Sequence, residues 1–228
     1  MTSISTDQNK ILMDLERLVV NSDLYLNLGE PPIPTRFIRL LDLLLTACEV
    51  PGERKKIFIQ AAACLHMALT THEQIPLQTI ENEGLHRVRQ LTVLAGDFYS
   101  SLFYQQLAMA GEIDGIVCLS QATSRTNERK MKMYCGEEPV SSSIRKIESV
   151  EILTAIAGFF LVEHHIGKEW MTVFLPLLLL DELIEHPRWQ DRFHDAVYQA
   201  GEIWKQPRFP VWLRHELEQW IEQERRNL

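Results

Sequence analysis

The chain has 228 residues, of which 46% are hydrophobic and 24% are charged, so it can bury a full core and is not intrinsically disordered. Its net charge of −8 argues against non-specific nucleic-acid binding, which needs a basic surface. The most apolar stretches, TAIAGFFLV and MTVFLPLLLL, are shorter than the roughly 20 residues of a membrane-spanning helix, so we expect no transmembrane segment.

Apolar residues recur at helical spacing along almost the whole chain, and no segment alternates as a strand would. A first helix follows Asp7 and is broken by GEPPIP at 29–34, and a second follows Thr35 and ends at VPGE. Further helices are expected at about 53–73, 91–110, 112–134, 144–165, 168–186 and 189–205, with a short charged helix after KQPRFP. This pattern predicts an all-α helical bundle.

Two segments between these helices are predicted to be irregular. Residues 76–90 are expected to form a loop or a weak helix, and CGEEPVSSS at 135–143 is a possible internal linker. We nevertheless predict a single all-α domain over residues 1–228.

The cysteines and the N-terminus favour a cytoplasmic protein. No two cysteines have C-x-x-C spacing and most lie among apolar residues, so we expect reduced, mostly buried thiols at Cys48, Cys64, Cys118 and Cys135. The N-terminal residues are polar and acidic, and no secretory signal is expected there.

The stretch CLHMALTTHEQIP at 64–76 places two histidines near the end of a predicted helix. His66 and His72 are six residues apart, about 120° around the helix, so they cannot close a metal site together. His72 shares its face with Leu65 and Leu69. We therefore predict that His72 is a hydrogen-bonded histidine at the edge of a core rather than a zinc ligand.

The predicted helix LTVLAGDFYSSLFYQQLA is apolar on two sides. One side carries Leu91, Leu94, Phe98 and Leu102, and the other carries Ala95, Tyr99, Phe103 and Leu107. Such a helix must be covered on both sides, either at the centre of its own bundle or by another subunit. The basic stretch RTNERKMKMY downstream is either a solvated helix end or a contact for an anionic partner or a diphosphate-bearing product.

Three phrases, LHMALTTHEQIP, RQLTVLAGDFYSSLFYQQLA and TNERKMKMY, resemble in order and spacing the small subunit, component 1, of bacterial heptaprenyl diphosphate synthases. The resemblance covers about residues 55–135 and implies a fold similar to that of the trans-prenyltransferases (isoprenoid synthases). The family-matching positions outside the histidine stretch are Gly96, Asp97, Asn127, Glu128, Lys130 and Met131.

In catalytic proteins of that fold the helix matching 55–77 ends in His-Asp-Asp-x-x-Asp, whose acids hold Mg²⁺ on an allylic diphosphate. Here the matching positions are His72, Glu73, Gln74 and Leu77, so one carboxylate remains. A second acidic motif could match LLLLDELIE through Asp181, Glu182 and Glu185, although an ordinary charged helix end explains these residues as well. The resemblance thus implies a vestigial motif, with no catalytic residue and no metal ligand in this chain.

The resemblance further implies a heteromer, in which a large subunit carries the aspartate-rich motifs and Mg²⁺ and adds isopentenyl diphosphate to an allylic diphosphate. This chain would be the non-catalytic small subunit, needed for activity and for product length, and the heptaprenyl product would feed menaquinone side-chain synthesis. We expect five side chains to pack on the partner and to bound the tunnel that holds the prenyl tail: Leu94, Phe98, Tyr99, Leu102 and Phe103.

Two other functions stay open. The chain could be a self-sufficient but divergent Mg²⁺-dependent prenyltransferase or terpene synthase that uses Glu73 and the acids at 181–185. It could also be a helical adaptor that has no link to isoprenoids.

Overall fold

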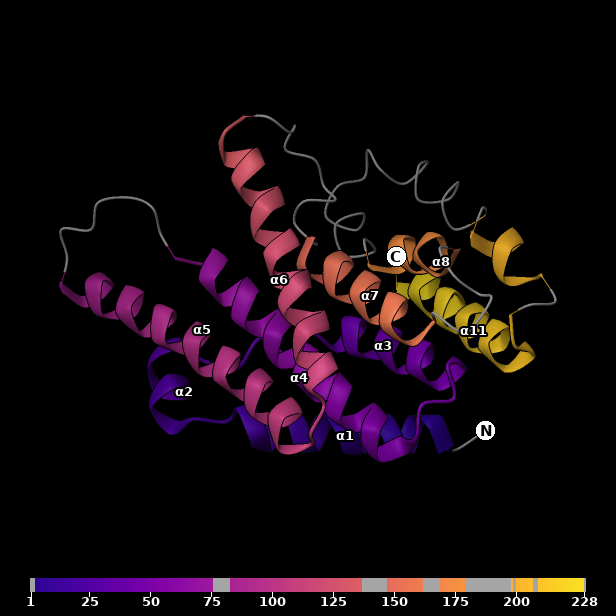
Figure 1. Ribbon diagram of the computed structural model, residues 1–228, viewed down its shortest axis with the longest axis horizontal. Coiled ribbons are helices and arrows are strands. Elements are labelled where there is room, and N and C mark those ends of the chain that lie inside the picture. Colours follow the sequence, from indigo (N-terminus) through magenta and orange to yellow (C-terminus); the bar gives the residue numbers. More distant parts are fainter. Residues whose placement is uncertain are drawn as a thin grey trace. The chain divides into compact units, whose positions relative to one another are not determined.

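The computed structural model describes most of the chain, namely residues 3–75, 83–136, 147–161, 169–178, 198, 200–206 and 209–227. Its elements are all helices, and the described residues contain no strand (Figure 1). In chain order the helices are α1 (Ser3–Val19), α2 (Ser22–Leu28), α3 (Thr35–Ala47), α4 (Gly52–Glu73), α5 (Glu83–Met109), α6 (Ile113–Tyr134), α7 (Ile147–Phe160), α8 (Glu169–Leu178) and α11 (Val211–Asn227). The predicted all-α class is confirmed.

The chain divides into two compact units. Unit 1 comprises Met1–Asp42 and Pro51–Gln121, and unit 2 comprises Leu43–Val50 and Ala122–Leu228. The boundary falls within α6, whereas the sequence suggested a linker at 135–143, of which residues 137–143 lie outside the described residues.

The N-terminal part of unit 1 differs from the sequence prediction, because the expected first helix is two helices. Asn21 caps α2: its Oδ1 accepts hydrogen bonds from the backbone N–H groups of Asp23 at 3.0 Å and Leu24 at 3.1 Å. An asparagine at this position satisfies N–H groups that have no partner inside the helix and therefore favours a new helix start. Gly29, with φ of 85°, then ends α2.

The core of unit 1 is built around α4. Residues 58–65, 67–69 and 71 of this helix are all buried, so α4 is covered on every side. A helix that is apolar all round is typical of a domain centre. The two longest helices of the unit, α4 and α5, pack along each other. Gly115 of α6 lies so near α4 that a Cβ there would be 2.8 Å from the Phe58 ring.

Three basic residues at the start of α4 attach it to its neighbours by ion pairs. Arg54 donates hydrogen bonds from Nε and Nη2 to the two carboxylate oxygens of Glu112, at 2.6 and 2.9 Å. Lys55 lies 2.8 Å from the buried carboxylate of Asp42, and Lys56 Nζ donates to Asp14 Oδ2 at 2.5 Å. These pairs fix the start of α4 against α3, α1 and the turn that precedes α6.

Helix α5 begins at Glu83, eight residues earlier than predicted. Residues 83–90 are therefore helical, in agreement with the weak-helix alternative, and residues 76–82 lie outside the described residues. The segment EGLHRVRQ consists mainly of good helix formers with a glutamate in the first turn, and these outweigh the single glycine, Gly84.

The core of unit 2 contains an aromatic group. Trp170 of α8 lies with its ring centroid 4.9 Å from that of Phe174 and 5.6 Å from that of Phe209, and all three are buried. Trp204, Leu213 and Leu217 are also buried in this unit. The helices predicted at 144–165, 168–186 and 189–205 are confirmed only over their described residues.

Candidate functional site

The end of α4 that carries His72, Glu73 and Gln74 packs against the middle of α5. The His72 ring lies directly over Gly96, where a Cβ would be 2.5 Å from both Cε1 and Nε2 of the ring. Nε2 of His72 is 3.6 Å from Oδ1 of Asp97, a distance too long for a hydrogen bond but within range of an ion pair when the histidine is protonated. Two family-matching residues of α5 therefore meet the histidine of α4.

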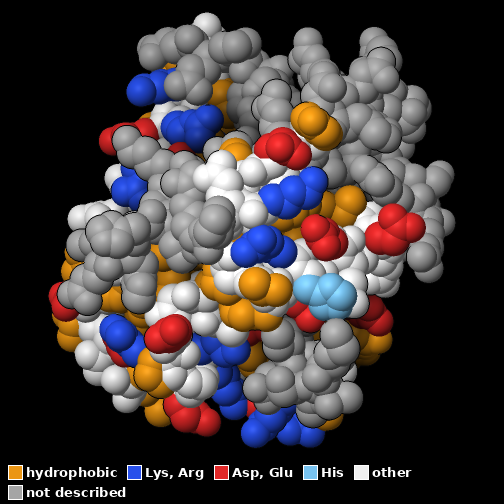
Figure 2. Space-filling model, turned by 90° about the vertical axis from the view of Figure 1, so that its right-hand side faces the viewer, with side chains coloured by type: hydrophobic (Ala, Val, Ile, Leu, Met, Phe, Trp, Pro, Cys, Tyr) orange, Lys and Arg blue, Asp and Glu red, His pale blue; other side chains and the backbone are white. Residues whose placement is uncertain are grey.

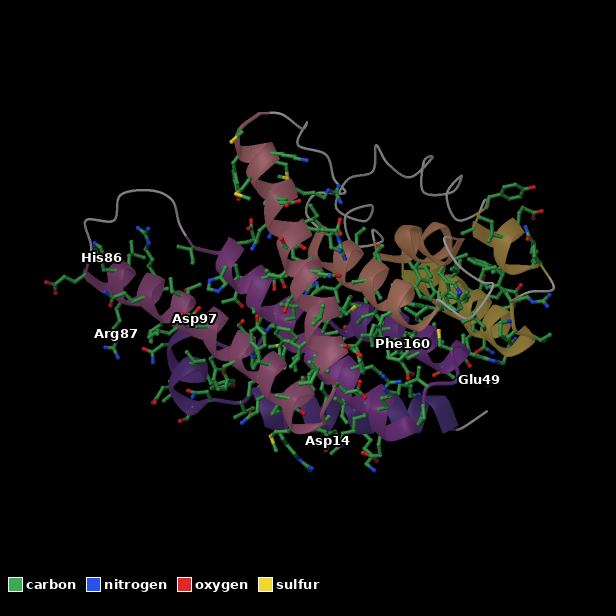
Figure 3. All side chains as sticks on the ribbon, viewed as in Figure 1. Asp14, Glu49, His86, Arg87, Asp97 and Phe160 are labelled. Carbon is green, nitrogen blue, oxygen red and sulfur yellow. The ribbon has the colours of Figure 1, made fainter. Side chains whose placement is uncertain are left out.

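The acidic and amide side chains near His72 are exposed. Glu73 and Gln74 are exposed, and so is Asp97, which Figure 3 shows midway along α5, while His86 and Arg87 lie at that helix's N-terminal end. Among the described residues no three His, Cys, Asp or Glu side chains converge as a metal site. The other acids considered, Asp181, Glu182 and Glu185, lie outside the described residues, as does Leu77.

The two apolar sides of α5 have different surroundings. The side with Ala95, Tyr99, Phe103 and Leu107 is buried within the chain, and Tyr99 is only 4% exposed. Burial, together with the nearby Cys64 thiol, raises the pKa of the Tyr99 hydroxyl. The sequence left open whether this side meets a partner, and the structure assigns it to the interior of unit 1, against α4.

The other apolar side of α5 is partly exposed to solvent. Leu94 is 58% exposed, Leu91 and Phe98 are half-buried, and only Leu102 is fully covered. Of the five side chains predicted to pack on a partner, Tyr99, Leu102 and Phe103 are thus interior residues of this chain. Leu94 and Phe98 retain surface that a partner can cover.

The basic stretch on α6 binds carboxylates of the same unit. Arg125 Nε and Arg129 Nη1 each donate to one oxygen of Glu151, both at 3.0 Å, and Lys130 Nζ donates to Glu148. Both glutamates belong to α7 and are buried. The prediction of a solvated helix end is therefore wrong for these three residues, because a buried carboxylate needs a cation beside it.

These two glutamates were missed by the sequence analysis. The sequence does contain an indication of them, since Glu148 and Glu151 are acids three residues apart in the mainly apolar segment IESVEILTAIAGFF.

The residues of α6 that match the family fall into two groups. Lys130 is turned inward to Glu148, whereas Asn127, Glu128 and Met131 are exposed.

A known protein family matches most of the chain. Residues 24–225 match the model of the family described as heptaprenyl diphosphate synthase (HEPPP synthase) subunit 1. The chain belongs to this family. The resemblance inferred from the sequence is confirmed.

A curated relative of the HEPPP synthase subunit 1 family is heptaprenyl diphosphate synthase component 1 from Geobacillus stearothermophilus. It is 35% identical over 112 residues, which is 49% of this chain and 44% of the relative, so the aligned region spans less than half of that protein. No solved structure matches the chain.

Three of the four cysteines of this HEPPP synthase subunit 1 family member are buried. Cys48, Cys64 and Cys118 are buried and Cys135 is exposed, none of them in a disulfide, and burial raises the pKa of Cys48 and of Cys64 to about 12. Such thiols are not nucleophiles at neutral pH.

None of the helices in the part of the chain that the structure describes combines the length and hydropathy needed to traverse a bilayer. Basic and acidic side chains are interspersed on the face shown in Figure 2.

Proposed function

We propose that the chain is the non-catalytic subunit of a two-component heptaprenyl diphosphate synthase. A larger catalytic subunit would hold Mg²⁺ and add isopentenyl diphosphate to an allylic diphosphate, and the product would supply the menaquinone side chain. Membership of a family described as subunit 1 supports the existence of a second component. The observation that carries the non-catalytic role is the end of α4, where His72, Glu73 and Gln74 stand in place of a metal-binding acidic cluster.

The donor set at this end argues against metal chemistry in this chain. Mg²⁺ prefers hard oxygen ligands, and clustering it around two diphosphates needs several converging carboxylates. Gln74 carries no charge and Glu73 is a single exposed carboxylate. His72 is packed on Gly96 and is therefore held by the α4–α5 contact. Metal and both diphosphates would then be bound by the catalytic subunit.

In the complex, this chain would contribute an apolar helix surface. Leu91, Leu94 and Phe98 form a half-open apolar side of α5, whose other side, with the buried Tyr99 and Phe103, packs against α4. An apolar helix face suits a surface that covers the partner and bounds the tunnel for a growing prenyl tail, because such a tail has only apolar contacts to make. Product length would depend on the side chains at the closed end of that tunnel.

Reconstitution tests this function. The purified chain, the purified catalytic subunit and their mixture are assayed with Mg²⁺, isopentenyl diphosphate and an allylic diphosphate. Turnover is expected from the mixture and not from this chain by itself. Comparable turnover by the isolated chain would instead support a self-sufficient prenyltransferase. A failure of this chain to bind and activate the catalytic subunit would support a helical adaptor.

A further inference from the structure

Three basic side chains form a stripe along the last turns of α6, beside α7. Arg125, Arg129 and Lys132 are four and three residues apart, a spacing that places them on one face of a helix. We name these three side chains the α6 basic stripe. All of them belong to unit 2, and so does Glu151, the residue of α7 that accepts a hydrogen bond from each arginine. The stripe and its carboxylate thus lie within one compact unit of the fold.

The carboxylate of Glu151 neutralises part of this positive charge. It lies between two guanidinium groups, 3.0 Å from a nitrogen of each, and Lys132 is a further, exposed cation of the stripe. The neighbouring Lys130 and Glu148 are buried and pair with each other, and Glu128 is an exposed acid beside the stripe. Residues 122–134 and 147–160 together carry four cations and three carboxylates, so this part of a chain with a net charge of −8 has an excess positive charge.

The two arginines of the stripe can still donate hydrogen bonds. A guanidinium group has several N–H donors, and the bonds to Glu151 use Nε of Arg125 and Nη1 of Arg129. The arginine side chains are 43% and 35% exposed, so part of each is open to solvent. Because both arginines bond to the same carboxylate, they are held close together on the helix surface, which is the arrangement that an anion with several oxygens requires.

We propose that the α6 basic stripe binds a diphosphate group. Oxygens of one phosphate would accept hydrogen bonds from the outer N–H groups of Arg125 and Arg129, and Lys132 would attract the other phosphate as a point charge. The group can belong to a prenyl diphosphate or to inorganic pyrophosphate, which share this chemistry. The inference rests on the proposed function, because prenyl transfer uses the first compound and releases the second, and it adds a binding site formed by this chain's own residues.

Calorimetric titration of the full chain in the presence of EDTA tests the site, with inorganic pyrophosphate and farnesyl diphosphate as the two ligands. Arginine and lysine bind phosphate oxygens without a metal, so saturable binding is expected in EDTA and should weaken as salt is added. Lys132→Gln should weaken binding about threefold or more, and Arg129→Gln about tenfold or more. Lys205→Gln, which removes an exposed cation elsewhere in unit 2, is the matched control and should change binding less than about twofold.

Substitution of the carboxylate should have the opposite effect. Glu151→Gln removes the negative charge that competes for both arginines, so diphosphate binding should become about threefold tighter or more. A cluster whose arginines serve only to stabilise Glu151 would give no binding in either form of the chain. Thermal unfolding of each variant identifies any that has lost its fold, and the exposed position of Lys132 keeps the test decisive in that case.

The outcomes separate this inference from the proposed function. Absence of saturable binding, or equal binding by the unmodified chain, Lys132→Gln and Arg129→Gln, would overturn the site. Binding that requires Mg²⁺ and disappears in EDTA would also overturn it, because carboxylates and a metal would then hold the ligand. Tighter binding of farnesyl diphosphate than of pyrophosphate would support the site with a prenyl diphosphate as its occupant, and equal binding would support it with the diphosphate group alone being recognised. A chain that binds diphosphate but does not activate the catalytic subunit would retain the site and refute the proposed function.

Discussion

The imidazole of His72 occupies the space beside Gly96 that the side chain of any other residue would need. The contact joins the end of α4 to the middle of α5, and Asp97 lies close enough to pair with the ring when it is protonated. A histidine that looks like the remnant of a metal site therefore has a present role in packing. The glycine of LAGDFYS is explained by the same contact, since its backbone is helical and needs no unusual φ.

Replacement of Gly96 by alanine should destabilise unit 1 by forcing the His72 ring out of its place. Overpacking of this kind costs about 1 to 3 kcal/mol, and the flexible ring favours the lower end. His72→Ala removes the clash, so Gly96→Ala should be much less harmful in that background. Urea unfolding of the two single variants and the double variant gives the coupling free energy.

Gly158 provides the matched control for that experiment. It is an exposed glycine within α7, and no heavy atom lies within 4 Å of the place that an alanine methyl group would take, so alanine meets no obstacle there. Gly158→Ala should stabilise the protein by about 0.5 to 1 kcal/mol, because alanine has the higher helix propensity. Equal and additive effects of Gly96→Ala in both histidine backgrounds would show that the ring does not restrict position 96.

The ion pair between Asp14 and Lys56 should make stability depend on pH (Figure 3 labels Asp14). The hydrogen bond from Lys56 lowers the pKa of Asp14 below its usual value of 3.8 in the folded state. The pair therefore stabilises the fold above pH 3.8, and this contribution is lost as the pH falls through the lowered folded-state pKa. Asp14→Asn should be less stable than the unmodified chain at pH 7, and the difference should vanish at low pH. A difference that stays constant from neutral to strongly acidic pH, measured by thermal unfolding, would contradict this assignment.

Removal of the Lys130 charge should be one of the more damaging substitutions in unit 2. Lys130→Met leaves the buried Glu148 carboxylate without its cation, which typically costs about 3 to 5 kcal/mol. Lys132→Met removes an exposed charge from the same helix and should change the free energy of unfolding by less than about 0.5 kcal/mol. In Lys130→Met/Glu148→Leu most of the loss should be recovered. Denaturant unfolding of all three variants checks this, and a similar loss in the double variant would mean that Lys130 acts by packing alone.

The regular helices could be predicted from the sequence because apolar spacing decides them locally. The break at Asn21 was missed although its cause is also local, since the asparagine cap competes with the continuing apolar stripe of α1. The pairing of Glu148 and Glu151 with the basic stretch was not predictable in the same way. It depends on which helix of unit 2 lies beside α6, and no local pattern contains that information.

At the candidate site, too, local sequence does not decide which of the two apolar sides of α5 is buried. Both sides carry leucine and aromatic residues at helical spacing, so composition does not distinguish them. What decides the orientation is the packing of α5 along α4, which covers the side that carries Tyr99. Of the residues predicted to face the partner, Leu94 and Phe98 retain exposed surface, whereas Tyr99, Leu102 and Phe103 pack inside the chain.

This difference between the sides gives the sharpest test of the proposed interface on α5. Tyr99→Ala should destabilise the isolated chain by about 3 to 5 kcal/mol, as truncation of a buried aromatic does. Leu94→Asp should leave the free energy of unfolding within about 0.5 kcal/mol of the unmodified value, because the side chain is exposed. It should nevertheless weaken the complex with the catalytic subunit about tenfold or more and alter the distribution of product lengths. Leu26→Asp on α2 is the control for added charge at an exposed apolar position. If Leu94→Asp and Leu26→Asp leave both affinity and product length unchanged, the open side of α5 does not face the partner.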